Sequence, residues 1–279
     1  MQGMSNTASE TYRSEYAEQI ARLTDLRDRR IEQAFATVPR ENFLPPPPWT
    51  AISVGIATRT SDVAGIYDNV LVAIDRKRGI NNGEPALHAA WLDEVCPQAG
   101  ETVIHVGAGL GYYTAILASL VEPHGCVEAY EYEADLAAQA SQNLRAYSHV
   151  KVHGESAFGR PLPKADVIYV NAGVMAPDVE WLKALKPGGR LIFPWQPHEG
   201  WGPAIMVRRL EGGFSATPLM TVGFISCSGT EDEHASKSLP NEADLASVRS
   251  IWPTSERLPD ETAVAVYDQV WFSSGVVGS

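Results

Sequence analysis

The stretch HVGAGLGYYTA, residues 105 to 115, follows the apolar run Thr102 to Ile104. A glycine-rich turn between a predicted strand and a predicted helix is typical of nucleotide-binding folds. Glycines stand at the first, third and fifth positions of this turn, namely Gly107, Gly109 and Gly111. The dinucleotide fingerprint needs glycine at the sixth position, where this chain has the much larger Tyr112. The spacing argues against NAD and FAD, and the turn also lacks the Lys-Ser/Thr ending of a P-loop.

Beyond this turn, predicted strands alternate with predicted helices. Strands are expected at residues 102–106, 126–131, 149–153, 165–171 and 190–194, and helices at 112–121, 134–147 and 177–185. A turn is expected at residues 186–189. The near-continuous apolar strand 165–171 is typical of a parallel sheet that is covered on both faces. The alternation predicts an α/β fold with a doubly wound, Rossmann-like sheet.

The segments on either side follow other patterns. Apolar residues recur near the helical period in residues 8–38, which predicts a helix ended by Pro39. The proline run predicts extended chain at residues 44–49, and glycine and asparagine punctuation predicts irregular structure at residues 50–83. The remaining expectations are helices at 86–95 and 241–252, strands at 204–210, 219–226 and 262–272, and a mobile loop at 228–240.

These patterns suggest three parts. They are an N-terminal helical and active-site-loop segment (1–95), a cofactor-binding Rossmann-like domain (96–227) and a C-terminal extension (228–279). The extension could cover a site, pair at a sheet edge or form a dimer contact, and the sequence does not choose among these roles. The oligomeric state stays open for the same reason.

Composition limits the partners. The net charge is −12, and the basic cluster at residues 76–78 reads as a solvated loop, so we expect no nucleic-acid partner. No apolar window of about 18 residues exists, so we expect no membrane association. Three widely spaced cysteines favour a reducing compartment, the cytoplasm. His149 and His153 share one side of a predicted strand without further ligands, so no metal site is expected.

Two acidic positions sharpen the choice of nucleotide. Glu131 ends the second predicted strand, 20 residues beyond Gly111, where a carboxylate accepts hydrogen bonds from both ribose hydroxyls. Glu155 and Ser156 follow the third predicted strand, where an acceptor binds the amino group of adenine. A glycine turn, a ribose acid and an adenine acid on successive strand ends indicate adenosine without phosphates. We therefore expect S-adenosyl-L-methionine as the cofactor.

Several motifs resemble those of the protein-L-isoaspartate (D-aspartate) O-methyltransferases, a family of class I S-adenosylmethionine-dependent methyltransferases. The matching stretches lie within residues 28–227 and read RIEQAFATVPRENFLP, YDNVLVAI, VIHVGAGLGYYTAILASLV, VEAYEYEADLAAQASQNL, VKVHGESAFG and LKPGGRLIFPW. The segment AFATVPRENF singles out this family among methyltransferases. The resemblance implies a carboxyl O-methyltransferase that acts on a protein or peptide.

The resemblance also implies roles for the cofactor-site residues. Gly107, Ala108, Gly109 and Gly111 would line the methionine part, Glu131 would hold the ribose, Tyr132, Glu155 and Ser156 would border the adenine, and Asn171 would lie next to the sulfonium. His105 stands where the family usually has an acid close to the amino group of the cofactor. A protonated imidazole at this position would repel an ammonium group.

The predicted acceptor site is the loop Asn81-Asn82-Gly83-Glu84 with His88 in the following helix. The family has a serine at the place of Gly83, so the hydroxyl is missing, and Asn81 or Asn82 is expected to supply the polar contact instead. A carboxylate acceptor is ionised at pH 7, because its pKa is about 4, and needs no general base. An alcohol or amine acceptor would need one, and the candidates are His88 and Glu84.

The sequence thus favours methylation of an isoaspartyl-type carboxylate. A tailoring methyltransferase for a biosynthetic peptide or small molecule is the first alternative, supported by the asparagine loop and the C-terminal extension. A non-catalytic cofactor-binding scaffold is the second. A nicotinamide dehydrogenase is disfavoured by Tyr112.

Overall fold

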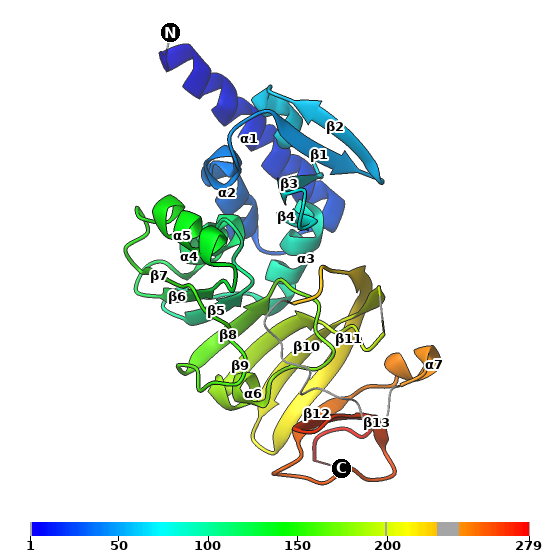
Figure 1. Cartoon of the computed structure of the whole chain (residues 1–279). Coiled ribbons are helices and arrows are strands. Elements are labelled where there is room, and N and C mark those ends of the chain that lie inside the picture. The colour runs from blue at the N-terminus through cyan, green and yellow to red at the C-terminus, as the bar shows by residue number, and fades with distance from the viewer. Residues whose placement is uncertain (1, 199, 228–239, 279) are drawn as a thin grey trace. The chain divides into compact units, whose positions relative to one another are not determined.

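The structure is a computed structural model that describes residues 2–198, 200–227 and 240–278 (Figure 1). The chain divides into two compact units, each made of several stretches. The first unit comprises Met1–Gly100, Ala108–Val127 and Ala134–Val152, and the second comprises Glu101–Gly107, Glu128–Glu133 and His153–Ser279. The predicted division by sequence into three parts remains a prediction.

Helices make up much of the first unit. They are α1 (Gln2–Thr24), α2 (Arg29–Thr37), α3 (Pro85–Val95), α4 (Tyr112–Val121) and α5 (Ala134–Asn143), with the short 3-10 turns η1 (Arg40–Phe43) and η2 (Val63–Ile66). The single helix predicted for residues 8–38 is wrong in one respect, because it is interrupted between α1 and α2. Asp25 adopts a left-handed φ of 49°, and the carboxylate of Asp28 then caps α2 by accepting from the Arg30 N–H at 2.9 Å.

A cluster of aromatic rings forms the centre of the first unit. Tyr16 of α1 and Tyr112 of α4 each lie about 6 Å from the ring of Phe35 of α2, and all three are buried. The guanidinium of Arg40 is 5.8 Å from the rings of both tyrosines and is 0% exposed. Tyr112, at the position where the dinucleotide fingerprint needs glycine, is therefore a core residue of this unit.

The prediction of irregular structure at residues 50–83 is wrong. This segment forms a four-stranded sheet in the order β2-β1-β3-β4, made of β1 (Trp49–Ser53), β2 (Ile56–Thr60), β3 (Leu71–Asp75) and β4 (Ile80–Asn81). Val54 and Gly55, with φ of 48° and 78°, form the tight two-residue turn between β1 and β2. The side chains of β2 are mostly exposed, so the strand lacks the apolar alternation that reveals a strand in a sequence.

A ten-stranded sheet, counted over the described residues, dominates the second unit. Its order is β13-β14-β12-β11-β10-β9-β8-β5-β6-β7 (Figure 1). Strands β5, β8 and β9 are parallel, and β9, β10 and β11 continue the sheet in antiparallel fashion. The bounds are β5 (Thr102–Val106), β6 (Cys126–Tyr130), β7 (Val150–His153), β8 (Ala165–Val170), β9 (Leu185–Pro194), β10 (Trp201–Leu210) and β11 (Gly213–Gly223), with helix α6 (Val179–Ala184) before β9.

The described part of the C-terminal extension completes this sheet at its edge. It contains α7 (Glu242–Leu245), β12 (Ser250–Pro253), β13 (Ala263–Val266) and β14 (Val270–Ser273). The helix predicted for residues 241–252 is wrong beyond its first turn, and the strand predicted for 262–272 is a hairpin of β13 and β14. The turn predicted at residues 186–189 is part of β9. The loop predicted at residues 228–240 falls almost wholly outside the described residues.

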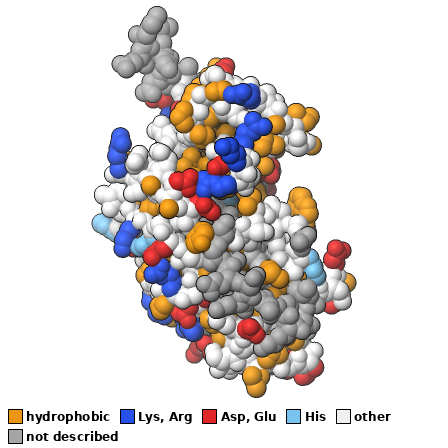
Figure 2. All heavy atoms as spheres, in the orientation of Figure 1, with side chains coloured by type: hydrophobic (Ala, Val, Ile, Leu, Met, Phe, Trp, Pro, Cys, Tyr) orange, Lys and Arg blue, Asp and Glu red, His pale blue; other side chains and the backbone are white. Residues whose placement is uncertain are grey.

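Surface charge is mixed. Figure 2 shows basic and acidic side chains interspersed on the face that it draws. Within the predicted basic cluster, Arg78 pairs with Asp75 at 2.9 Å and with Asp135 at 2.6 Å. Among the described residues, no helix has the length and apolar character to cross a membrane.

Replacing Gly111 by alanine is expected to destabilise the protein more than replacing Gly100. Both glycines have a positive φ, 96° and 84°, so either change strains the backbone, at about 1–2 kcal/mol. A Cβ on Gly111 would lie 2.8 Å from Cδ1 of the buried Leu144, whereas nothing lies within 4 Å at Gly100. Overpacking adds about 1–3 kcal/mol. Urea unfolding of the ligand-free variants measures the difference, and equal losses at both glycines would contradict the packing argument.

Candidate functional site

The predicted cofactor residues of the second unit lie at the ends of neighbouring strands. β8, β5, β6 and β7 are adjacent in the sheet, and β5 and β8 run parallel. The carboxyl ends of parallel strands meet at one edge of a sheet, where α/β folds bind their ligands. The strands are followed at this edge by Gly107 after β5, Glu131 after β6, Glu155 after β7 and Asn171 after β8.

The first close contact at this edge joins Gly107 and Asn171. Gly107 has a φ of 79°, and a Cβ there would lie 3.4 to 3.5 Å from backbone and side-chain atoms of Asn171. The N–H of Gly107 donates to the Tyr130 carbonyl at 2.9 Å, and the N–H of Asn171 donates to the Val106 carbonyl at 2.8 Å. The side-chain Oδ1 of Asn171 is buried and has no hydrogen-bond partner within the described residues. An unused acceptor at this place fits a ligand that brings a donor or a positive charge.

Glu131 is a buried carboxylate, 7% exposed. Its Oε1 accepts from the Glu133 N–H at 2.9 Å, which fixes the side chain against its own loop. Burial, followed by the negative charge of Glu131, raises the pKa of the Cys227 thiol to about 12. Cys227 therefore lies close enough to Glu131 for the charge of the carboxylate to raise the pKa of the thiol. A buried carboxylate is a strong acceptor for hydroxyl donors, as a ribose would supply.

His105 is fully buried within β5. Its ring lies edge-on to Tyr169 of β8 at 5.8 Å, and it is 0% exposed. Burial lowers the pKa of His105 from 6.5 to about 3. The imidazole is therefore neutral at physiological pH, so it does not repel a cationic group at this edge of the sheet.

The residues predicted to border the adenine are more exposed. Tyr132 is 52% exposed. The carboxylate of Glu155 forms an ion pair with Arg160, and the hydroxyl of Ser156 accepts from the Phe158 N–H at 3.1 Å. Glu155 thus has its charge balanced by a neighbour.

The glycine turn continues into the first unit. The N–H of Gly111 donates to the carbonyl of Ala108 at 2.9 Å, which closes the turn before α4. Gly109, with a φ of 56°, would place a Cβ 3.5 Å from Cδ1 of Ile74 in β3. β3 therefore packs against this part of the turn.

The predicted acceptor loop also lies in the first unit and is held by its asparagines. Oδ1 of Asn81 accepts from the Gly83 N–H at 2.9 Å. Asn82 is only 8% exposed, and its Oδ1 accepts from the Val72 N–H at 2.9 Å and from Nη2 of Arg40 at 3.2 Å. Glu84 is exposed, and its carboxylate accepts from Nδ2 of Asn69 at 2.6 Å.

His88 is shielded. It is 1% exposed and stacks on Tyr113 of α4, with ring centroids 3.7 Å apart. Its Nε2 lies only 2.3 Å from the position that a Cβ on Gly83 would take. The imidazole thus occupies the space of the side chain that Gly83 lacks. Tyr113 also donates to the Gly83 carbonyl at 3.3 Å, which ties the loop to α4.

The two histidines considered for a metal bind other groups. His149 contacts the Ala118 carbonyl at 3.1 Å, and His153 contacts Glu128 at 2.5 Å while stacking on Tyr130. Over the described residues, no group of three or more His, Cys, Asp and Glu side chains is arranged to hold a metal ion.

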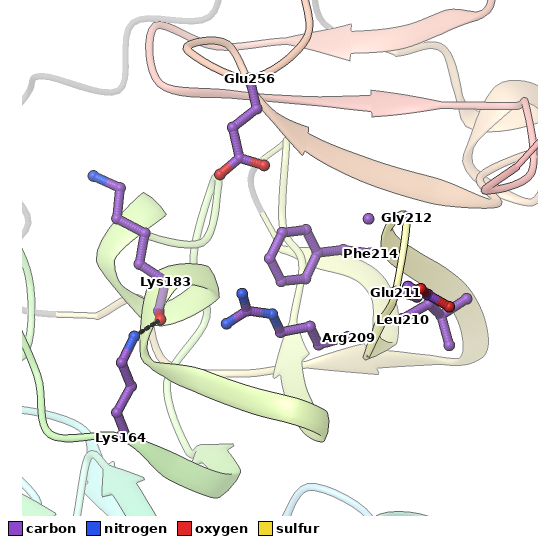
Figure 3. A pocket seen from close by; sticks show the side chains of 9 residues that line it. Lys164, Lys183, Arg209, Leu210, Glu211, Gly212, Phe214 and Glu256 are labelled. Carbon is purple, nitrogen blue, oxygen red and sulfur yellow. Dashed lines mark hydrogen bonds between the residues drawn. The ribbon is translucent and has the colours of Figure 1, made fainter.

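A cavity of about 530 Å³ opens elsewhere in the second unit (Figure 3). One of its walls is Lys164, which precedes the amino end of β8, so the cavity lies at the edge opposite to Asn171. Lys164 donates to the Lys183 carbonyl at 2.7 Å, and Arg209 donates to the Leu185 carbonyl. Both cations therefore cap the carboxyl end of α6. None of the predicted site residues lines this cavity; its walls are Lys164, Lys183, Arg209, Leu210, Glu211, Gly212, Gly213, Phe214 and Glu256.

Sequence reasoning missed three contributors. Arg40 stands in the segment that singles out the family, but nothing in the pattern showed that it is buried. Tyr113 looked like an ordinary helix residue, and its contact with His88 depends on the fold. Cys227 lies near the end of β8, because its N–H donates at 2.8 Å to the carbonyl of Gly173, which is two residues beyond Asn171.

Comparison with known proteins identifies the family. The family model for protein-L-isoaspartate(D-aspartate) O-methyltransferase (PCMT) matches residues 14–232. The protein-L-isoaspartate O-methyltransferase of Pelotomaculum thermopropionicum is 30% identical over 232 residues, which cover 82% of this chain and 93% of the relative. The enzyme of the same name from Thermotoga maritima is 28% identical over 170 residues, 59% of this chain, and the match spans only 50% of that relative.

A solved structure shares the fold. The beta-aspartate methyltransferase (PCMT) of Plasmodium falciparum, crystallised in complex with S-adenosyl-L-homocysteine, superposes with a TM-score of 0.63 at 18% identity, covering 78% of this chain and 99% of that one. This likeness confirms the predicted Rossmann-like α/β fold. The chain belongs to the protein-L-isoaspartate(D-aspartate) O-methyltransferase family, so the predicted enzyme class, a methyltransferase, and the predicted cofactor, S-adenosyl-L-methionine, are confirmed.

Proposed function

We propose that this chain methylates the carboxylate of an isoaspartyl residue in a protein or peptide. The observation that carries the proposal is the state of the acceptor loop. Both candidate bases are occupied by other contacts: His88 is 1% exposed and stacked on Tyr113, and the carboxylate of Glu84 accepts from Nδ2 of Asn69 at 2.6 Å. A carboxylate needs no base because it is already ionised. The two relatives from Thermotoga maritima and Pelotomaculum thermopropionicum are named protein-L-isoaspartate O-methyltransferases, which supports the same acceptor for this chain.

The strand ends of the second unit would hold the cofactor. When bound, S-adenosyl-L-methionine supplies a methyl group on a sulfonium. Glu131 would accept hydrogen bonds from the ribose hydroxyls, and Oδ1 of Asn171 would accept from the donor nearest to it. Gly107, Ala108, Gly109 and Gly111 would let the backbone come close to the methionine part. Tyr132, Glu155 and Ser156 would border the adenine.

The neutral state of His105 supports this assignment. The family usually has an acid at this place, and a protonated imidazole would repel the amino group of the cofactor. Because burial holds the pKa of His105 at about 3, the ring carries no charge at neutral pH. His105 would therefore contact the cofactor as a neutral group.

We place this reaction in the cytoplasm. Among the described residues, Cys96, Cys126 and Cys227 form no disulfide bond. Cysteines outside disulfides are typical of a reducing compartment.

Replacing Glu131 by glutamine is expected to weaken cofactor binding. The amide keeps the shape but loses the charge, and a hydrogen bond to a charged acceptor contributes about 1.5–3 kcal/mol. The dissociation constant of S-adenosylhomocysteine, measured by calorimetry, should rise by about ten- to hundredfold. Glu133→Gln, which alters only the neighbouring side chain, serves as the control. An unchanged affinity in Glu131→Gln would remove Glu131 from the ribose site.

Methyl transfer is expected on isoaspartyl peptides and not on their normal aspartyl counterparts. The assay incubates the protein with methyl-labelled cofactor and paired peptides, and it measures label released by mild base, because carboxyl esters are base-labile. Label found only on other acceptors would support a tailoring methyltransferase. Cofactor binding without any transfer would support a non-catalytic scaffold.

Acid is expected to destabilise the protein through His105. The folded-state pKa of about 3 lies below the unfolded value of 6.5. Between these values the unfolded chain binds a proton that the folded chain does not, so stability falls as the pH drops through this window. His105→Gln should reduce that slope by about 1.4 kcal/mol per pH unit in urea unfolding. Equal slopes for wild type and His105→Gln would refute a buried neutral imidazole.

A further inference from the structure

Arg40 is a buried cation whose partners are all neutral. Its guanidinium donates to three backbone carbonyls and to one amide: Ile66 at 2.6 Å, Asp68 at 3.2 Å, Val70 at 2.7 Å and Oδ1 of Asn82 at 3.2 Å. Its Nε is buried without a hydrogen-bond partner in the described part of the chain. A buried charge without a counter-ion is unfavourable and persists where something else requires it.

The two carboxylates nearest to Arg40 in the sequence and among its contacts, those of Glu41 and Asp68, accept hydrogen bonds from donors other than Arg40. Glu41, the next residue, accepts from the hydroxyls of Ser9 and Tyr67. The carboxylate of Asp68 accepts from Nε2 of Gln19 at 2.8 Å, and only its backbone carbonyl meets Arg40. The positive charge is therefore not neutralised by a hydrogen-bonded carboxylate.

Asn82 connects this charge to the acceptor loop. Its Oδ1 accepts from two donors, the Val72 N–H and Arg40, so the orientation of the amide is fixed. The other end of the amide, Nδ2, is a buried donor with no partner among the described residues. Hydrogen bonds in series polarise one another, so the charge of Arg40 makes this amide a stronger dipole with its positive end at Nδ2. Gly83, the centre of the acceptor loop, is the next residue.

We infer that Arg40 and Asn82 select an anionic acceptor: the field of the buried cation, passed on by the Asn82 amide, favours a carboxylate over a neutral group at the acceptor loop. Asn82 is a positioning residue in this scheme, since it acts by transmitting the charge of Arg40. An anionic acceptor would balance the buried charge. The inference rests on the proposed function and names the element that recognises its substrate class.

The variant Asn82→Asp tests this inference directly, because the substitution is expected to leave the protein folded. Aspartate keeps both acceptor contacts, gives Arg40 a counter-ion and removes the unused donor. The unfolding temperature should therefore rise, by about 2–4 °C. Recognition should weaken at the same time, because the field at the loop is cancelled.

Recognition is measured as binding, with the protein loaded with S-adenosylhomocysteine. Wild type should bind an isoaspartyl peptide about tenfold or more tightly than the same peptide with the free α-carboxylate of the isoaspartyl residue converted to an amide. Asn82→Asp should lose this preference and keep its affinity for S-adenosylhomocysteine. Asn42→Asp, an exposed asparagine two residues from Arg40, adds the same charge and should change neither stability nor preference.

Turnover gives an independent readout. The field stabilises the acceptor carboxylate most before transfer, since its charge is lost in the transition state. Asn82→Asp should therefore raise KM for the isoaspartyl peptide about tenfold without lowering kcat. A stabilised variant with unchanged preference and KM would overturn the inference, as would a destabilised variant. Wild type that prefers the carboxylate peptide but transfers no methyl group would refute the proposed function and leave the inference supported.

Discussion

The close approach of the ends of β5 and β8 is the constraint on which the cofactor edge of the sheet depends. Gly107 leaves this strand with a φ of 79°, which residues with a side chain rarely adopt, and a Cβ there would be in van der Waals contact with Asn171. Because the two strands are parallel and directly paired, their ends meet at one place. The neighbouring strand ends then contribute the buried carboxylate of Glu131. An orphan acceptor, a buried carboxylate and a neutral imidazole suit a ligand that carries hydroxyl donors and positive charge.

The first unit contains a buried guanidinium, that of Arg40, whose hydrogen bonds must be satisfied within the protein. The guanidinium of Arg40 lies 5.8 Å from the rings of Tyr16 and Tyr112 and donates to backbone carbonyls of the segment before β3. The same arginine fixes Asn82 and so shapes the loop before α3. His88 and Tyr113 fix the following residues by stacking. The acceptor loop is therefore held by Arg40, by the side-chain amides of Asn81 and Asn82 and by the stack of His88 on Tyr113.

Local pattern predicted the parts of the fold that are set locally. Thr102–Val106 and Tyr112–Val121 were placed to the residue, since a continuous apolar run and a glycine turn specify them. Residues 241–252 carry apolar side chains at helical spacing, but β12 forms there because it pairs with β11 and β14. In the candidate site, the residues at strand ends could be predicted from local pattern. The burial of Asn82 and His88 could not, because it depends on contacts with Arg40 and Tyr113, which are distant in sequence.

A crystal structure with S-adenosylhomocysteine tests the central claim most directly. The account predicts density along the edge formed by Gly107, Glu131 and Asn171, with the ribose hydroxyls within hydrogen-bond distance of Glu131 and a donor on Oδ1 of Asn171. Density for the ligand at another edge of the sheet, or a ribose that contacts neither side chain, would contradict it.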